Sequence, residues 1–390
     1  MASYHSEART LAQLPPPTVD EIAHSNRLVD FLITEMERHG GIISFHDYMQ
    51  FVLYQPGLGY YSAGLSKFGA RGDFVTAPEI SNLFGSTLGR QCELIFEQGC
   101  ARNILEFGAG SGRFCAQILA SLKQGCAYSI IELSADLRLR QQEYLQSCLP
   151  GEVFQQLRWL DQLPTEFSGI VLGNEVLDAM PVHLVSKDQQ WYELGVEFDG
   201  KGFKLGRVAD ESQAVSAIGK IESTHGPMAS GYTTEVNLYY RPWLNALRES
   251  CKQAVVLMID YGYEQAQYYH PERVSGTLVC HYRHRSHADA LVYPGLQDIT
   301  ASVDFDAFAD AAIDCDFKMG GFSTQGQFLL SGGLLEEAES VLADSDSKGR
   351  LGLAQQIKTL TLPTEMGERF KVIGLHRNLD IEIPAFAQGR

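Results

Sequence analysis

The 390-residue sequence predicts an α/β fold in which a mostly parallel sheet carries helices on both faces. From residue 103 onward, short apolar runs typical of strands alternate with longer amphipathic runs typical of helices. Before residue 98 the pattern is helical with one long glycine-rich loop, and between about 186 and 250 the alternation is interrupted. We therefore expect a helical and lid region over residues 1–98. A sheet domain should follow over residues 99–390, with a hairpin and helix inserted at about 186–250.

Two helices are predicted near the N-terminus. In "VDEIAHSNRLVDFLITEMERHGG" the apolar residues Ile22, Leu28, Leu32 and Met36 recur at roughly helical spacing, and two glycines end the run. A second helix is predicted for "SFHDYMQFVLY", with Ser44 as its N-cap. The stretch "QPGLGYYSAGLSKFGARGDFVTAPEIS" has the period of neither regular element, so we expect a long loop of the kind that is usually functional. A helix resumes at "SNLFGSTLGRQCELIFEQ".

The alternating region supplies the sheet and its covering helices. The predicted strands are "NILEF", "YSIIEL", "FQQLRWL", the start of "GIVLGNEVLDAMPV" and "QAVVLMIDYG". The predicted helices are "GRFCAQILASLKQ" and "SADLRLRQQEYLQSCL", the second capped by Ser134. In the insertion, "QWYELGVEFDGKGFKLGRV" is typical of a hairpin and "EVNLYYRPWLNALRES" of a helix. We expect "GTLVCHYRH" and "GQFLLSGG" to be closing strands that flank the helical "FDAFADAAIDC".

Composition restricts the function classes. The formal net charge is -17, which argues against general binding of nucleic acid or of anionic membranes. Hydrophobic residues make up 45% of the chain, which is normal for a globular protein with a sizeable core. No run is long enough for membrane insertion. The eight cysteines include no C-x-x-C pair and are expected to be reduced thiols. The N-terminus has neither a secretory signal nor an arginine-rich presequence, so we expect a bacterial cytoplasmic protein, or a matrix protein if the source is eukaryotic.

The motif "FGAGSG" between a predicted strand and a predicted helix indicates a nucleoside-type ligand or a tight turn. Its glycines are Gly108, Gly110 and Gly112. A dinucleotide fingerprint would have a glycine where Arg113 stands, and a phosphate-binding P-loop would end in G-K-[ST], which is absent here. A nicotinamide coenzyme is therefore disfavoured.

Acidic residues around this loop favour S-adenosylmethionine (SAM). The carboxylate of Glu106 would repel a pyrophosphate but attract the α-ammonium group of an amino-acid ligand, and SAM carries such a group. Glu132 ends the next strand, where it would accept both ribose hydroxyls, and Asp161 follows the third strand, where it would accept the adenine amine. The alternative for Glu132 and Asp161 is a solvated strand end.

The motif "GNEVLDAMPV" supplies candidates for the acceptor side. Asn174 would accept a hydrogen bond from the SAM ammonium, while Glu175 and Asp178 would bind a cationic acceptor such as a guanidinium. Glu235 in "TTEVN" is a further candidate for this clamp. The alternative is that Glu175 and Asp178 cap a helix.

The motif "GARGDFVTAPEIS" is typical of a lid over a ligand. Gly72 can adopt positive φ, Asp73 would close over the cofactor, and Thr76 would fix the end of the loop. A rigid structural loop is the alternative. In "HYRHRSH", three histidines stand three residues apart, at His281, His284 and His287. They are interleaved with arginines after a predicted strand, so we expect a basic loop and no metal site.

With these motifs assembled, the chain resembles the MidA-like methyltransferase family, which includes a mitochondrial protein-arginine methyltransferase that assists assembly of respiratory complex I. The motifs "GDFVTAPEIS", "FGAGSGRF", "IELSADLRLRQ", "GNEVLDAMPV", "IDYGY" and "MGERFKVIGL" all look like those of the family, in the same order. The resemblance implies a class I SAM-dependent methyltransferase with a Rossmann-like sheet. It also implies a protein partner as substrate, with a subunit of a respiratory complex as the candidate.

Two other functions remain open from the sequence. The methyl acceptor would be a different protein side chain or a small molecule, or the chain would bind SAM and act as an assembly factor by docking. The acidic residues of "NEVLDAMP" favour catalysis over docking.

Overall fold

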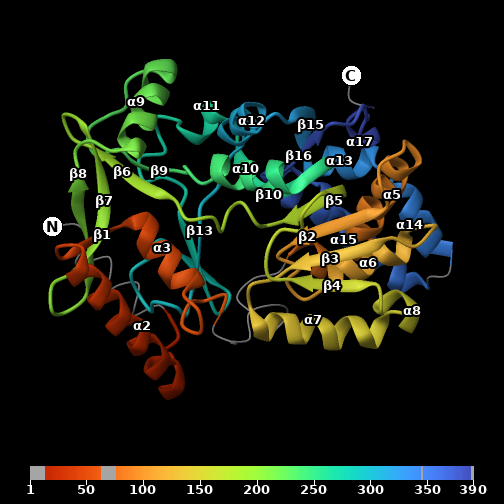
Figure 1. Cartoon of the computed structure of the whole chain (residues 1–390), viewed down its shortest axis with the longest axis horizontal. Coiled ribbons are helices and arrows are strands. Elements are labelled where there is room, and N and C mark those ends of the chain that lie inside the picture. Colours follow the sequence, from red (N-terminus) through yellow and green to blue (C-terminus); the bar gives the residue numbers. More distant parts are fainter. Residues whose placement is uncertain (1–13, 63–75, 344–345, 388–390) are drawn as a thin grey trace. The chain divides into compact units, whose positions relative to one another are not determined.

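The computed structural model describes residues 14–62, 76–343 and 346–387. Its contacts divide the chain into two compact units, each assembled from separate stretches (Figure 1). The first unit comprises Met1–Phe74, Asp178–Tyr240 and Tyr263–Asp304, and the second comprises Val75–Leu177, Arg241–Gly262 and Phe305–Arg390. These boundaries differ from the predicted division at residue 98. Helix α5 (Asn82–Glu97) falls in the second unit because its apolar face, including Phe84 and Leu88, packs into the core of that unit.

The second unit contains the predicted parallel sheet, with strand order β15-β16-β10-β5-β2-β3-β4 (Figure 1). Strands β10, β5, β2, β3 and β4 are mutually parallel. Strand β16 runs antiparallel to β10, and β15 pairs antiparallel with β16, so β15 runs in the same direction as the five parallel strands. The α/β prediction is confirmed. The strand order reverses between β2 and β5, and ligands of such sheets bind at this point, beyond the carboxyl ends of the strands. The bounds are β2 (Asn103–Phe107), β3 (Ala127–Ile131), β4 (Leu157–Leu160), β5 (Phe167–Asn174), β10 (Cys251–Tyr263), β15 (Lys318–Thr324) and β16 (Phe370–Arg377).

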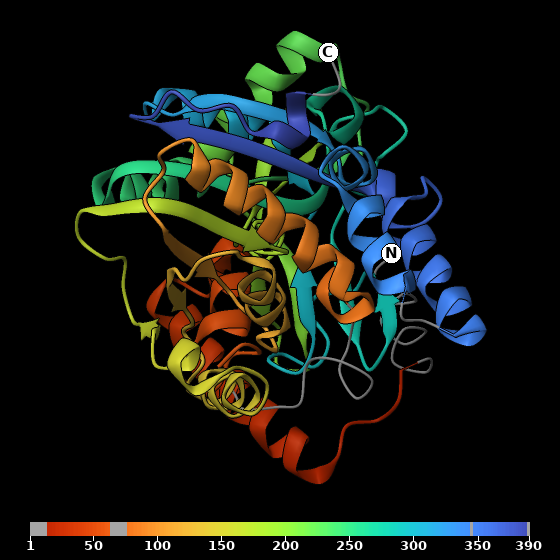
Figure 2. The same ribbon diagram turned by 90° about the vertical axis from the view of Figure 1, so that its right-hand side faces the viewer.

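Helices cover both faces of this sheet. On one face Ile104 packs with α5 and α6 (Arg113–Ser121), and Figure 2 shows α5 lying along the strands. On the other face Phe107 contacts Trp243 of α10 (Tyr240–Ser250), with ring centroids 5.1 Å apart. The remaining helices of the unit are α4 (Ala77–Ile80), α7 (Ala135–Cys148), α8 (Gly151–Phe154), α12 (Phe305–Asp314), α13 (Gln325–Ser331), α14 (Leu334–Ala343), α15 (Ser347–Thr361), α16 (Met366–Arg369) and α17 (Pro384–Ala387).

The first unit combines the N-terminal helices with most of the insertion. Strand β1 (Ile42–Ser44) pairs with β7 (Trp191–Phe198), so residues far apart in the sequence share one sheet. The hairpin of β7 and β8 (Phe203–Ala209) is confirmed, and so is the Ser44 cap, whose Oγ accepts from the Asp47 amide. The other elements are α2 (Val19–Arg38), α3 (Phe45–Tyr54), β6 (His183–Lys187), α9 (Gln213–His225), β9 (Thr233–Val236), α11 (Gln265–Tyr268), β11 (Val279–Tyr282), β12 (Arg285–His287), β13 (Asp298–Thr300) and β14 (Val303–Asp304).

Three predicted elements were wrong in type or place. The stretch "GQFLLSGG" is helix α13, because Gln325, Phe328 and Leu329 are buried at helical spacing, and β15 and β16 close the sheet instead. The stretch "GTLVCHYRH" does form strand β11, but it pairs with β12 and β13 in a separate sheet of the first unit. The predicted helix "EVNLYYRPWLNALRES" begins as strand β9, which pairs with β6, before α10 starts at Tyr240.

No helix within the described ranges is long and apolar enough to span a bilayer.

Candidate active site

The glycine loop follows β2 at the point where the strand order reverses. Gly108, Gly110 and Gly112 have φ values of 60°, 54° and 85°, a region that side-chain-bearing residues rarely adopt. Gly112 is the left-handed N-cap of α6. A Cβ atom at Gly112 would lie 3.3 Å from the side chain of Leu145. The three glycines are therefore required by the backbone path, and their missing side chains let a ligand approach the main chain.

Glu106 lies in β2 directly before this loop and is buried, with 2% of its surface exposed. The hydroxyl of Tyr128 donates to its Oε2 at 2.8 Å. Burial raises the pKa of Glu106 to about 8, the negative charge of Glu132 adds to the rise, and the Tyr128 hydrogen bond opposes it. A cationic group bound here would stabilise the ionised carboxylate, which fits the predicted contact with the ammonium of SAM.

Glu132 follows β3 and is also buried. Its Oε1 accepts from the amide of Ser134 at 2.9 Å, and its Oε2 accepts from Nε2 of Gln141 at 2.9 Å. These two bonds fix the plane of the carboxylate at the carboxyl edge of the sheet. A fixed carboxylate at this edge is what ribose recognition requires.

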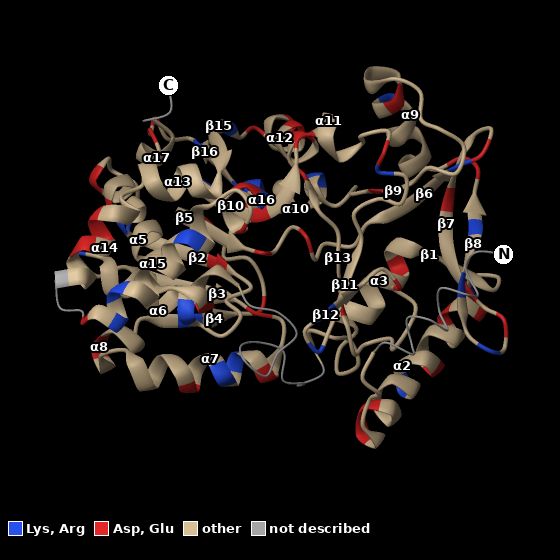
Figure 3. Cartoon of the chain, turned by 180° about the vertical axis from the view of Figure 1, so that it is seen from behind, with Lys and Arg blue, Asp and Glu red and all other residues tan. Residues whose placement is uncertain are grey.

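Asp161 follows β4 and forms an ion pair with Arg138, whose Nη2 lies 2.7 Å from Oδ1. Its side chain is 87% exposed. A depression of about 400 Å³ beside it is lined by Leu133, Ala135, Arg138, Leu139, Gln142 and Asp161. Figure 3 shows both signs of charge along α7, where Asp136 and Arg140 also pair. The depression lies at the carboxyl ends of β3 and β4, where the adenine end of the cofactor is expected.

Asn174 ends β5, and its Oδ1 is buried without a hydrogen-bond partner among the described residues. Its Nδ2 donates to Glu175 at 3.1 Å. A buried acceptor of this kind is costly unless a ligand or water satisfies it, so Asn174 fits the predicted contact with the SAM ammonium.

Glu175 begins a turn with a left-handed backbone, at φ 55°. Its amide donates to the carbonyl of Ile259 at 2.9 Å. The next two amides, those of Val176 and Leu177, donate to a single carboxylate oxygen of Asp260, which is fully buried in β10. Residues 175–182, between β5 and β6, form turns and no helix, so capping a helix does not explain these acidic residues. Non-glycine residues with positive φ cluster at functional sites.

Asp178 lies in the first unit and is buried. Its carbonyl accepts from the amide of Ala301 at 2.9 Å. Nearby, the hydroxyl of Tyr61 donates to Asp298 at 2.8 Å, and Tyr54 stacks on Tyr61 with ring centroids 5.3 Å apart. Burial raises the pKa of Tyr61 well above its usual value, and the charges of Asp298 and Asp178 contribute. Asp178 thus belongs to a group of carboxylates and tyrosine rings, the residue types that bind a guanidinium.

Glu235 also lies in the first unit, in β9 one residue before the strand ends, and is 1% exposed. Its carboxylate accepts from the amides of Thr277 and Leu278 and from the hydroxyls of Thr277 and Tyr268. These bonds anchor the 276–278 turn to β9. A role of Glu235 in an acceptor clamp stays a prediction.

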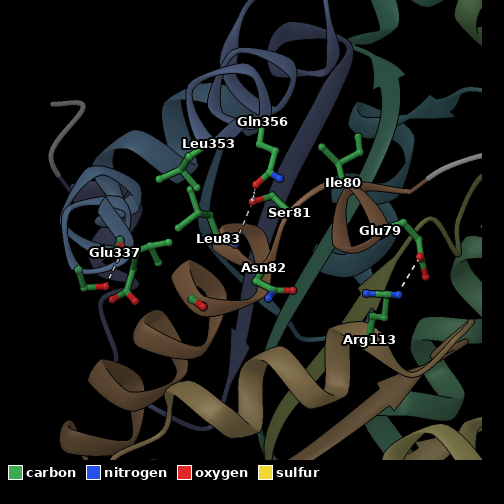
Figure 4. A pocket seen from close by; sticks show the side chains of 12 residues that line it. Glu79, Ile80, Ser81, Asn82, Leu83, Arg113, Glu337, Leu353 and Gln356 are labelled. Atoms are coloured by element: carbon green, nitrogen blue, oxygen red, sulfur yellow. Dashed lines mark hydrogen bonds and ion pairs between the residues drawn. The ribbon is translucent and has the colours of Figure 1, made fainter. Parts of the chain in front are cut away.

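Of the predicted lid residues, Gly72 and Asp73 lie outside the described residues. Thr76 is the N-cap residue of α4, and its side chain makes no capping hydrogen bond. Glu79 of α4 pairs with Nε of Arg113 at 2.9 Å and accepts from the hydroxyl of Ser111, which ties α4 to the glycine loop. Figure 4 shows this pair at a cavity of about 380 Å³ that also contacts α5, α14 and α15. The loop attachment through Glu79 has no signal in the sequence, since the partners are 32 and 34 residues away.

Within residues 14–62, 76–343 and 346–387, no group of histidine, cysteine and acidic side chains is placed to hold a metal ion. His281 lies in β11 and His287 in β12, while His284 is in the turn between these paired strands with φ 60°. Burial and the neighbouring His281 lower the pKa of His287.

The residues of the second unit therefore fit SAM. The buried carboxyl group of Glu106 suits its ammonium group, and so does the buried Asn174 oxygen, which has no partner in the part of the chain that the structure describes. The fixed carboxylate of Glu132 suits its ribose. No local sequence pattern pointed to Gln141, Arg138 or Tyr128, whose side-chain hydrogen bonds orient the acidic residues of this site.

Comparison with known proteins agrees with this reading. The family model described as "Putative S-adenosyl-L-methionine-dependent methyltransferase" matches residues 87–323. The chain is 28% identical over 369 residues to the mitochondrial protein arginine methyltransferase NDUFAF7 of Danio rerio, covering 85% of this chain and 82% of that protein. It is 26% identical over 395 residues to the NDUFAF7 homolog of Caenorhabditis elegans, covering 93% and 89%. A crystal structure from Burkholderia thailandensis, bound to S-adenosyl-homocysteine, is 40% identical, with a TM-score of 0.89 over 97% of this chain and 98% of that one.

Proposed function

Since the chain belongs to the family of S-adenosyl-L-methionine-dependent methyltransferases, we propose that it transfers the methyl group of SAM to an arginine side chain of a protein substrate. The names of its relatives support the arginine acceptor, because proteins matching 85% or more of this chain are named protein arginine methyltransferases. We further propose that the substrate is a subunit of a respiratory NADH dehydrogenase, as the resemblance to the MidA-like family implies.

The observation that carries this proposal is the placement of acidic side chains directly after β5. Glu175 stands in a strained turn next to Asn174, and Asp178 follows three residues later in the chain. SAM supplies an electrophilic methyl carbon on a sulfonium. The Asn174 oxygen and Glu106 would bind the cofactor ammonium, and the glycine loop and Glu132 would bind its ribose end.

An arginine acceptor needs carboxylates for a physical reason. A guanidinium is protonated at neutral pH, and its nitrogen lone pairs are delocalised. A carboxylate that binds two of the nitrogens in a bidentate pair localises the positive charge on them, which leaves the third nitrogen more nucleophilic. Under this proposal Glu175 binds the guanidinium and accepts the proton that the methylated nitrogen releases.

The test is transfer of a labelled methyl group. Purified protein would be incubated with methyl-labelled SAM and lysate of a strain that lacks the protein, and the labelled polypeptide identified by mass spectrometry with fragment ions that locate the modified residue. We expect a methylated arginine. Label found only on another side chain or on a small molecule would contradict the arginine proposal and leave the methyltransferase assignment intact.

A matched pair of variants separates catalysis from docking. Glu175→Gln should reduce transfer by roughly 100-fold or more and leave the affinity for S-adenosyl-homocysteine within about twofold. Glu143→Gln, a change of an exposed residue on α7, should alter neither quantity. Undiminished transfer by Glu175→Gln would remove this residue from the mechanism.

We propose the bacterial cytoplasm as the location, or the mitochondrial matrix if the source is eukaryotic. Relatives named mitochondrial support the second case for eukaryotic members. Fractionation of cells that express a tagged chain would test it, and recovery in the periplasm would contradict it.

A further inference from the structure

Helix α7 carries a buried glutamine whose amide reaches three separate parts of the cofactor site. Gln141 is fully buried. Its Nε2 donates to the carbonyl of Gly110 at 3.0 Å and to Oε2 of Glu132 at 2.9 Å, and its Oε1 accepts from the indole of Trp159 at 2.9 Å. One side chain thus links the glycine loop, the residue that follows β3 and strand β4.

The position of Gln141 in its helix is unusual for a glutamine. Leu137 and Leu145 lie four residues to either side and are buried, so Gln141 lies on the core-facing stripe of α7. A buried amide destabilises a protein unless its hydrogen bonds are made, and an apolar residue would suit this stripe without that requirement. Both amide hydrogens and the amide oxygen of Gln141 are used. The hydrogen bonds of Gln141 to Gly110, Glu132 and Trp159 therefore explain a polar residue at this buried position, whereas packing does not.

One turn earlier, Arg138 acts in a similar way at the adenine end. Its Nη2 contacts the carbonyl of Glu132 at 2.9 Å, the carbonyl of Leu160 at 3.2 Å and Oδ1 of Asp161 at 2.7 Å. The guanidinium therefore connects the ends of β3 and β4.

We propose that Gln141 and Arg138 are positioning residues for SAM. Gln141 holds the Glu132 carboxylate and the Gly110 carbonyl in the orientation that receives the ribose, and Arg138 holds the ends of β3 and β4 around the adenine. A carboxylate that is already oriented loses less conformational freedom when the cofactor binds, so affinity rises without a direct contact to the ligand. This inference concerns the cofactor and does not depend on the identity of the acceptor.

The main test is Gln141→Met, which keeps the length and helix propensity of the side chain and removes its amide. We expect the Kd for S-adenosyl-homocysteine, measured by calorimetry, to rise roughly tenfold or more. The KM for SAM should rise in proportion, and kcat at saturating SAM should change less than about threefold. Gln146→Glu, at an exposed position of the same helix, is the control and should behave as wild type.

A second ligand locates the effect. 5′-Methylthioadenosine has the ribose and adenine of SAM but no amino-acid group. Gln141→Met should weaken both ligands by the same factor, whereas Asn174→Ala should weaken only S-adenosyl-homocysteine. Equal binding of S-adenosyl-homocysteine by Gln141→Met and wild type would overturn the role of Gln141, as would a fall in kcat with no change in the KM for SAM.

If Gln141→Met fails to fold because the residue is buried, Arg138→Met still tests the proposal. The Arg138 side chain is partly exposed, so we expect a folded protein. Its KM for SAM should rise about threefold or more at unchanged kcat, and the melting temperature should stay close to that of wild type. An unchanged KM in a folded Arg138→Met protein would overturn the role of Arg138.

Discussion

Oδ2 of Asp260 lies 2.8 Å from the amide nitrogen of Leu177 and accepts its hydrogen bond. The same oxygen accepts from the amide of Val176 at 3.0 Å, and Oδ1 accepts from the amide of Tyr261 at 2.9 Å. A fully buried carboxylate in β10 therefore fixes the turn that begins with the left-handed residue Glu175. The strain of that turn, of order 1 to 3 kcal/mol, persists because the neighbouring strand holds it.

Asp260→Asn should loosen this turn. Both carboxylate oxygens of Asp260 accept hydrogen bonds from backbone amides, but an asparagine has only one acceptor oxygen. Some of these amides would therefore face its NH₂ group, which is also a donor. We expect unfolding in urea to show a loss of about 2 kcal/mol, together with a fall in methyl transfer. Asp310→Asn, an exposed change on α12, should stay within about 0.5 kcal/mol of wild type. A stable Asp260→Asn protein with full activity would show that the turn holds without this carboxylate.

The raised pKa of Glu106 predicts a pH-dependent stability. Between pH 5 and pH 8 this carboxyl group, whose ordinary pKa is 4.5, is mostly ionised in the unfolded chain, while the folded protein keeps its proton up to about pH 8. The folded state then binds more protons, so this group makes the free energy of unfolding fall as pH rises. Glu106→Gln removes the effect, and its stability relative to wild type should rise by up to roughly 4 kcal/mol from pH 5 to pH 8. If the unfolding free energies of wild type and Glu106→Gln, measured with urea, changed in parallel with pH, the raised pKa of Glu106 would be refuted.

The same group predicts proton release when the cofactor product binds. The ammonium of S-adenosyl-homocysteine next to Glu106 lowers the pKa of its carboxyl group, so wild type should bind more tightly at pH 8 than at pH 6. Calorimetry in buffers of different ionisation enthalpy would measure the released proton. Glu106→Gln should show weaker binding that does not vary over this range. A wild-type affinity that is flat with pH would place the ammonium elsewhere.

The part of the site that the sequence predicts is the part built by neighbours in the chain. A glycine loop between an apolar strand and an amphipathic helix, with Glu106 before it, is a local pattern, and the backbone at Gly108, Gly110 and Gly112 confirms it. Helix α7 and its Ser134 cap are equally local, since the cap hydroxyl accepts from an amide three residues on.

The rest depends on contacts that no local pattern encodes. Gln141 appears as one more polar residue in a polar helix until its partners, 9 to 31 residues away, are brought together by the sheet. The pairing of β1 with β7 joins stretches about 150 residues apart in the sequence, which is why the two units do not follow the predicted boundaries. In "GQFLLSGG" the three consecutive apolar residues are compatible with a strand and with a helix. The segment forms helix α13 because Phe328 and Leu329 pack into the core of the second unit in that conformation.

Gly112→Ala should weaken cofactor binding. The residue has φ 85°, and the added Cβ would lie 3.3 Å from Leu145, so the loop must shift or bear strain of about 1 kcal/mol or more. We expect the Kd for S-adenosyl-homocysteine to rise roughly tenfold. Gly219→Ala is the matched control, because that glycine lies in α9 with open space around it, and alanine there should raise stability by about 0.5 to 1 kcal/mol. Unchanged affinity in Gly112→Ala would mean that the ligand does not contact this loop.

Glu235→Gln tests whether this carboxylate is structural. Oε1 of Glu235 accepts from the amides of Thr277 and Leu278, and Oε2 accepts from two hydroxyls and the Thr277 amide. A glutamine would place its NH₂ group, a donor, against some of these donors. Burial raises the pKa of Glu235, and these hydrogen bonds oppose the rise, which shows that they compensate part of the cost of the buried charge. We expect a stability loss of about 2 kcal/mol in urea unfolding. Gly276 packs against this carboxylate and leaves no room for a side chain. A Cβ atom there would lie 2.2 Å from Oε1, so Gly276→Ala should also destabilise the folded protein. A Glu235→Gln protein of wild-type stability that has lost methyl transfer would instead support the predicted acceptor clamp.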